Sequence, residues 1–339
     1  MSCAGGAAGR GASGRGTEPP STTEGVESSD APSFAIGVPA SGVEPDVGSA
    51  LASLRASAAR TGENYEIVVA VNGPGDAAVA GATAFAAATG AVVRVLRLPV
   101  LSKVAAWNAI RAATRAPVIV FADADVRVAP GAIGDLLRRL AAEPALALVA
   151  GRESARLEPS DGLVARMAAI PYRFDFGSVP GRLYVLRTAA LPEPMPVNVL
   201  AEDAYLSVRL GQASFAKERA AVVYLRPPLT WRDCLRQRVR NEAGKLQLAR
   251  EFPELLARSG FGRYPWRAFL REIAPREYPL VALLLATRLV GRWRALRQIR
   301  HGFGSGWTVL PSTKCWVASG ETSAPTRGRV PASGGTARP

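Results

Sequence analysis

The sequence predicts an α/β fold with a doubly wound, mostly parallel sheet and a C-terminal helical extension. Between residues 33 and 150, short apolar runs alternate with segments of helical periodicity, as in parallel sheets. With 339 residues, of which 48% are hydrophobic, the chain is able to bury a sizeable core. Asp123 and Asp125 close one of the apolar runs, where open α/β sheets hold their ligands.

Each expected element has a local reason. The strands are apolar runs bounded by turn residues, and the helices repeat apolar residues every three or four positions. Gly62 ends the first helix, the segment 72–75 forms a turn, and Pro130 opens a helix at a position where its missing N–H costs nothing. The expected strands are 33–38, 65–71, 91–96, 117–122, 145–150, 181–187 and 220–225, and the expected helices are 46–60, 76–89, 102–114, 204–210 and 231–250.

Composition divides the chain into four parts. Residues 1–32 and 303–339 are rich in small and polar residues without apolar periodicity, which predicts disordered tails. Residues 33–250 form the predicted α/β domain, and residues 251–302 form a basic helical extension. The three cysteines are widely separated and odd in number, so no disulfide framework or metal spacing follows and a reducing cytoplasm is expected.

The N-terminus lacks the apolar segment of a signal peptide. The best membrane candidate, residues 279–290, is shorter than the roughly 20 apolar residues that a spanning helix needs. We expect this segment to be a core helix or to lie flat at an interface.

Positive charge is concentrated in one part of the chain. The net charge is +14, and residues 226–300 contain 17 Arg and Lys against 6 Asp and Glu, a surplus of 11. Such a block favours an anionic partner: a membrane surface, a phosphate-bearing substrate or a nucleic acid.

The pair Asp123 and Asp125 carries the most specific chemistry. Carboxylates at i and i+2 on an extended backbone point to the same side and repel each other unless a cation neutralises them. The pattern therefore predicts a divalent metal, Mg²⁺ or Mn²⁺, that bridges the protein to a diphosphate. The alternative is an ordinary turn at the end of a strand.

Six motifs in order resemble those of the inverting family 2 glycosyltransferases, which have the GT-A fold. The resemblance covers roughly residues 33–250. The motifs are Val38-Pro39-Ala40 with Glu44, Asn72-Gly73 with Asp76, Lys103 to Asn108, Asp123-Ala124-Asp125, Glu202-Asp203, and Gln237 with Arg240.

The resemblance implies a role for each matching residue. It implies that Asp125 is the metal ligand and Asp203 the catalytic base. The residues implied to bind the donor are Pro39, Glu44, Asn72, Asp76, Lys103, Asp123, Gln237 and Arg240. Two positions depart from the family pattern: Val71 stands where many members have an Asp that holds the nucleotide base, and Asn241 replaces a Trp.

Some of these residues also have simpler interpretations. Glu202 and Asp203 are favourable at the start of a helix, whatever their chemistry. Lys103 and Arg240 could simply face solvent. As a base, Asp203 would need a pKa above the usual value of about 3.9.

The expected activity is transfer of a sugar from a nucleotide-diphosphate donor to an acceptor hydroxyl or a lipid phosphate, with inversion. One alternative is an enzyme like the sugar-nucleotide pyrophosphorylases, although residues 39–44 lack the Gly-rich loop with a basic residue. Another is a non-enzymatic basic protein that binds anions or nucleic acid. We expect no nucleic-acid partner, and a cytoplasmic protein attached peripherally to the inner face of the membrane.

Overall fold

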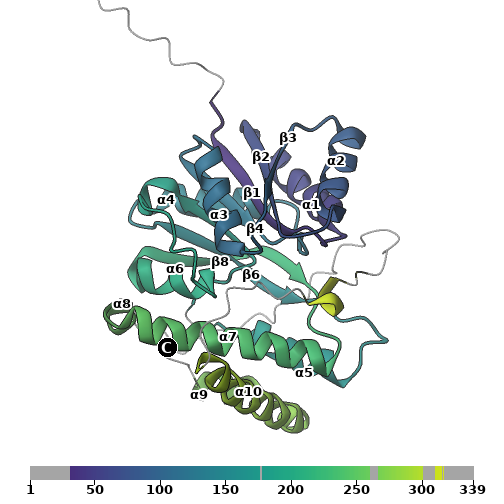
Figure 1. The fold of residues 1–339 in the computed structure, drawn as a ribbon, viewed down its shortest axis with the longest axis vertical. Coiled ribbons are helices and arrows are strands. Elements are labelled where there is room, and N and C mark those ends of the chain that lie inside the picture. The colour runs from purple at the N-terminus through teal and green to yellow at the C-terminus, as the bar shows by residue number, and fades with distance from the viewer. Residues whose placement is uncertain (1–30, 176–177, 260–265, 301–309, 315, 317–339) are drawn as a thin grey trace, which may run out of the picture. The chain divides into compact units, whose positions relative to one another are not determined.

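A three-layer α/β arrangement forms the main body of the protein (Figure 1). The computed structural model describes residues 31–175, 178–259, 266–300, 310–314 and 316. Within these residues one eight-stranded sheet has the order β3-β2-β1-β4-β7-β6-β8-β5. The strands are β1 (Phe34–Ser41), β2 (Tyr65–Asn72), β3 (Val93–Leu98), β4 (Val118–Ala122), β5 (Arg127–Val128), β6 (Leu148–Ala155), β7 (Leu183–Arg187) and β8 (Phe215–Leu225).

Each expected place holds a helix, and the structure adds α5 (Leu163–Ala169), which was not expected. The expected tail 1–32 lies almost entirely outside the described residues. The helices are α1 (Val47–Ala58), α2 (Ala77–Thr89), α3 (Lys103–Ala113), α4 (Ala132–Ala142), α5 (Leu163–Ala169), α6 (Glu202–Leu210), α7 (Trp231–Glu251), α8 (Pro253–Ser259), α9 (Trp266–Glu272) and α10 (Tyr278–Ile299).

Both faces of the sheet are covered, as the continuous apolar runs predict. Alternate residues of β1 face opposite cores: Ile36 packs in the cluster that includes α1, α2 and α4, whereas Ala35 packs in the cluster that includes α3 and α6. Helix α3 lies close to β1, since a Cβ on Gly37 would come within 2.5 Å of Ile110 Cγ2. The predicted fold class is confirmed.

The sheet is mixed, and its antiparallel part shapes the site. Strands β3, β2, β1 and β4 are parallel, but β7 runs antiparallel to β4 and pairs Leu183 with Ala122. The residue before Leu183 therefore lies beside the residue after Ala122, and Asp123 N–H donates to Arg182 O at 3.1 Å. After β1 the chain adds β2 and β3 on one side of this strand and then β4 on its other side. Parallel sheets bind ligands at such a point, which here lies between β1 and β4.

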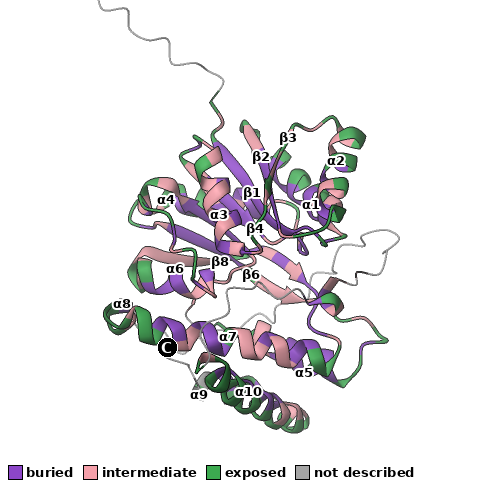
Figure 2. Ribbon diagram, in the orientation of Figure 1, coloured by how far each residue is buried: buried purple, intermediate pink, exposed green. Residues whose placement is uncertain are grey.

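Helices α8, α9 and α10 lie in the predicted C-terminal extension, and α10 packs against α7 (Figure 1). The backbones of α7 and α10 approach closely at Gly291, where a Cβ would come within 2.7 Å of Arg238 Cβ. One side of α10 is buried at Val281, Leu284 and Ala295, while much of its remaining surface is exposed (Figure 2). None of the helices in the described part of the chain is both long and apolar enough to cross a membrane.

Candidate active site

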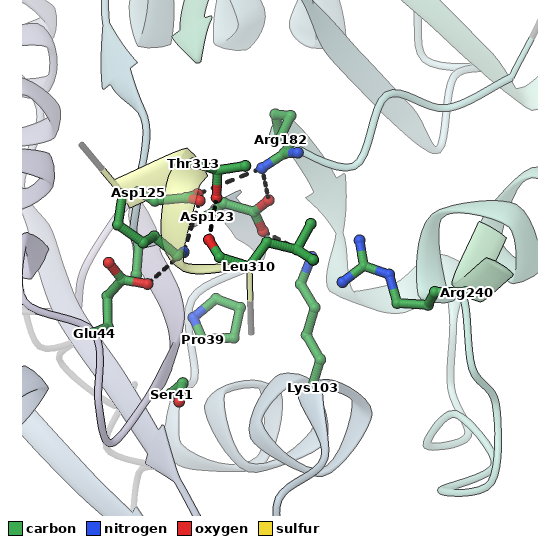
Figure 3. A pocket seen from close by; sticks show the side chains of 12 residues that line it. Pro39, Ser41, Glu44, Lys103, Asp123, Asp125, Arg182, Arg240, Leu310 and Thr313 are labelled. Atoms are coloured by element: carbon green, nitrogen blue, oxygen red, sulfur yellow. Dashed lines mark hydrogen bonds and ion pairs between the residues drawn. The ribbon is translucent and has the colours of Figure 1, made fainter. Parts of the chain in front are cut away.

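The ends of β1 and β4 open into a pocket that is lined by carboxylates and cations (Figure 3). Pro39 and Ser41 come from β1, and Asp123 and Asp125 follow β4 directly. The remaining lining residues are Glu44, Lys103, Ala124, Arg182, Arg240, Leu310, Thr313 and Lys314.

Every carboxylate oxygen of Asp123 and Asp125 has a cationic partner. Lys103 Nζ lies 2.7 Å from Asp123 Oδ1, and Arg182 lies 3.1 Å from Asp123 Oδ2 and 3.4 Å from Asp125 Oδ1. Lys314 Nζ lies 2.7 Å from Asp125 Oδ2. The two aspartates are thus fixed by three side chains from distant parts of the chain.

These partners set the charge of the motif. Burial alone would raise the pKa of Asp125, but Lys314 and Arg182 outweigh it and hold the pKa far below its usual range. Burial opposes the charge of Lys103 in the same way, yet Asp123 and Glu202 raise its pKa. Asp125 and Lys103 therefore both stay ionised at neutral pH.

Lys103 connects two halves of one site. Besides Asp123 it forms an ion pair with Glu202, the first residue of α6. A second pocket lies on this side, and Lys103, Asp123, Arg182 and Arg240 line both pockets. Glu202 and Asp203 line only the second pocket, so the Asp-X-Asp motif and the Glu-Asp pair face adjoining spaces.

Asp203 has the environment of a proton acceptor. Burial raises the pKa of its carboxyl group, and Glu202 raises it further, while Lys103 opposes the shift. Its Oδ1 accepts a hydrogen bond from Ala204 N–H at 2.8 Å, which fixes the side chain. Gly181 leaves room for it, since a Cβ there would lie 3.0 Å from Asp203 Cβ.

A second carboxyl group, Glu153 of β6, lines the same pocket as Asp203. Burial raises the pKa of Glu153 to about 7, Arg182 opposes the shift, and Asp203 and Asp123 add to it. Two carboxyl groups with raised pKa values in one pocket are typical of acid–base sites.

The loop before α6 is held by paired amide contacts. Asn108 donates to Met195 O at 2.8 Å and accepts from Met195 N–H at 3.0 Å. Gln247 of α7 likewise donates to Asn198 O and accepts from Leu200 N–H. These four hydrogen bonds fix the approach of the chain to Glu202 and Asp203.

The structure brings together most of the residues that the sequence singles out. Asn72 and Asp76 lie outside both pockets: the Asn72 amide is fully buried and donates to Ala40 O, while Asp76 is exposed and pairs with Arg97. Those that line one or both pockets are Pro39, Glu44, Lys103, Asp123, Asp125, Asp203, Gln237 and Arg240.

Sequence reasoning missed Arg182, Glu153 and Lys314. An antiparallel pairing of 181–187 with 117–122 would have revealed Arg182, because it places that residue opposite Asp123. Lys314 belongs to a segment that the sequence assigns to a disordered tail, yet residues 310–314 and 316 pack at the site. Trp316 was the available signal, since a large aromatic residue is unusual in such a tail.

The arrangement of carboxylates does not fit a divalent ion as it stands. Among the described residues, no three His, Cys, Asp or Glu side chains converge as a metal site. Asp125, the predicted ligand, already forms ion pairs with Lys314 and Arg182. An ion would have to displace one of these cations, and the predicted Mg²⁺ or Mn²⁺ stays a prediction.

Comparison with known proteins agrees with this fold. The mannosyltransferase PcManGT of Pyrobaculum calidifontis, solved with GDP-Man and Mn²⁺, is similar with a TM-score of 0.52 and 17% identity, over 83% of this chain and 77% of that chain. Staphylococcus aureus TarS gives 0.46 and 13%, over 76% and 49% of the two chains. Mycobacterium tuberculosis glucosyl-3-phosphoglycerate synthase gives 0.44 and 20%, over 68% and 80%. No curated protein matches the chain.

The likeness to the first of these structures shows a common fold. Residues 35–186 match the model of Glycosyl transferase family 2, which supports the assignment of this segment as a glycosyltransferase domain. The matched segment includes Pro39, Lys103, Asp123 and Asp125, whereas Asp203 and Arg240 lie beyond it. The predicted family and enzyme class are confirmed.

Proposed function

We propose that this glycosyltransferase moves a sugar from a nucleoside-diphosphate donor to an acceptor, with inversion of the anomeric carbon. The observation that carries the proposal is the pair of adjoining pockets that share Lys103, Asp123, Arg182 and Arg240. One pocket has the cations that a diphosphate needs, and the other contains Asp203, whose raised pKa suits a base. Attack from a face opposite the leaving diphosphate inverts the sugar.

The leaving group gathers negative charge as the glycosidic bond breaks. Lys103 and the guanidinium groups of Arg182 and Arg240 are positioned to stabilise it, since fixed cations in a site that excludes water act strongly on developing charge. Asp203 takes the proton of an acceptor hydroxyl. A phosphate acceptor would already be ionised and would need this base less.

A thermal-shift panel tests the donor assignment. We expect one of UDP, GDP, ADP, CDP or dTDP, or its sugar conjugate, to raise the Tm of the protein, since a ligand at a hundred times its Kd adds about 2.7 kcal/mol of stability. The matched nucleoside monophosphate should act more weakly, because it lacks the second phosphate. If no nucleoside diphosphate stabilises the protein, with or without Mn²⁺, the donor assignment is wrong.

We further propose that the acceptor is carried by lipid and that α10 rests on an anionic membrane surface. Leu285, Leu289, Trp293 and Leu296 are exposed and recur at helical spacing, so they form one apolar stripe. Arginines flank this stripe, and the Arg297 guanidinium lies 4.3 Å from the ring centroid of Trp293. A helix with exposed apolar residues between cations is suited to the headgroup region.

Vesicle co-sedimentation tests this location. Each Lys or Arg near an anionic surface contributes about 1 kcal/mol, so the change of Arg292, Arg294 and Arg297 to Gln should weaken binding about a hundredfold or more. We expect binding to require anionic lipid and to weaken with added salt.

A triple variant at Arg60, Arg138 and Arg139 is the matched control, because it removes the same charge from exposed positions outside α10, on α4 and in the turn after α1. Its binding should stay close to that of the unmodified protein. Equal binding to neutral and anionic vesicles, or equal losses in the two triple variants, would show that the stripe and its arginines are not a membrane surface.

A further inference from the structure

The ammonium group of Lys314 occupies the position where the Asp-X-Asp motif is expected to hold a cation. It lies 2.7 Å from Asp125 Oδ2 and also pairs with Glu44 Oε2. Glu44 is 2% exposed and the Lys314 side chain is 16% exposed. Lys314 therefore neutralises two carboxylates that are almost out of contact with water, and it does so at the wall of the donor pocket.

Contacts on both sides of Lys314 fix the segment that carries it. Ser312 N–H donates to Asp233 Oδ2 at 3.0 Å, and Ser312 Oγ accepts from Leu229 N–H at 3.2 Å. These bonds attach the segment to the start of α7.

On the other side, the indole N–H of Trp316 donates to Asp125 O at 3.0 Å. The guanidinium of Arg127 lies 4.7 Å from the ring centroid of Trp316, within the range of a cation–π contact. Lys314 is thus held between two anchored points and does not reach Asp125 as an isolated side chain.

Removal of Lys314 would leave the charges of this site unbalanced. Asp125 would keep Arg182 on one oxygen only, and Glu44 would lose the only cation that the described residues bring to it. Two buried carboxylates close together would then repel each other, which is the situation that attracts a divalent ion.

We propose that Lys314 is the cation that Asp125 and Glu44 hold against the donor diphosphate, in place of a divalent metal ion. An ammonium group has three N–H donors, and the described carboxylates engage it at two oxygens. The third donor is available to a phosphate oxygen in the pocket that Lys314 lines. This inference rests on the proposed function, because it assumes a diphosphate donor.

Calorimetric titration of the full chain tests the inference, with UDP, GDP and inorganic pyrophosphate as probes. In EDTA, the unmodified protein should bind at least one of them. Lys314→Met keeps the length of the side chain but removes its charge, and it should weaken this binding about tenfold or more, as for loss of a charged hydrogen bond. Lys314→Arg should bind more tightly than Lys314→Met.

Mn²⁺ alone provides a second readout, measured by the loss of its free electron paramagnetic resonance signal. The unmodified protein should leave Mn²⁺ free, whereas Lys314→Met should bind it through the released carboxylates of Asp125 and Glu44. Mn²⁺ should then restore diphosphate binding to this variant. Lys245→Met is the control, because Lys245 pairs with Glu242 on α7 outside both pockets, and it should change neither measurement.

Three results would overturn the inference. The first is binding of the probes by the unmodified protein only when Mn²⁺ is present. The second is Lys314→Met binding them in EDTA as well as the unmodified protein does. Either result leaves the proposed function intact and refutes the role of Lys314 alone. The third is no diphosphate binding under any condition, which refutes the proposed function together with the inference.

Discussion

Asp203→Asn should lower kcat by about 10² to 10⁴ while it leaves donor affinity unchanged. The amide retains the size of the carboxylate, and its oxygen can still accept the hydrogen bond from Ala204 N–H. It cannot take a proton from an acceptor hydroxyl. The variant should therefore fold normally, bind the nucleotide normally and fail at the chemical step.

The pH dependence of kcat gives an independent measure of the same role. Because burial and Glu202 raise the pKa of Asp203, kcat should fall on the acid side at a pH above the usual range of aspartate. Release of the nucleoside diphosphate is the signal, and Asp135→Asn on α4 is the control because Asp135 lies outside both pockets. An unchanged kcat, or a loss confined to the donor KM, would falsify the assignment of Asp203 as the base.

The order of strands and helices along the chain was predictable because each strand or helix depends on its local sequence. Apolar runs and helical spacing placed β1 to β4 and α1 to α4 near their observed positions. The site at the end of β4 followed from the same pattern, since Asp123 and Asp125 close a buried run. Strand β8 begins at Phe215 rather than at residue 220, where the apolar character starts.

The partners of the two aspartates could not be predicted in this way. Arg182 reaches them because β7 is antiparallel to β4, a pairing that the apolar pattern of 181–187 does not specify. Lys314 lies 189 positions from Asp125 in the sequence, and its segment has no periodicity that would indicate where it packs. Pairings over such distances depend on tertiary packing.

Asn72 shows the opposite case, a residue that the motif singles out but that lies outside both pockets. It matches the expected motif, but its side chain is turned into the protein and supports β1 through Ala40 O. A motif match names the loop that carries a function, whereas the direction of each side chain is settled by the packing around it. Asp76, at the start of α2, is likewise directed to solvent and Arg97.

Lys103→Met should lower the free energy of unfolding by about 3 kcal/mol at neutral pH, since a buried ion pair that loses one partner leaves an uncompensated charge. Lys103 forms one ion pair with Asp123 and another with Glu202. Asp123 retains Arg182, so most of the loss should come from Glu202, whose side chain is 9% exposed.

The sign of the pH effect follows from the shift of Lys103 itself. Asp123 and Glu202 raise the pKa of Lys103 above its unfolded value, so its contribution to stability is fully present at neutral pH and is lost only as pH rises through the raised pKa. Urea unfolding at neutral and at mildly alkaline pH should therefore show a loss of similar size in Lys103→Met. The double variant Lys103→Met with Glu202→Gln should regain much of the stability at neutral pH, because it removes the unpaired charge as well.

Lys245→Met provides the comparison, because Lys245 pairs with Glu242, which keeps Arg292 at 3.6 Å as a second cation, so this variant should lose less stability. No recovery in the double variant would show that Lys103 stabilises the fold by packing alone. Its role as the link between the Asp-X-Asp motif and the Glu-Asp pair would then be wrong.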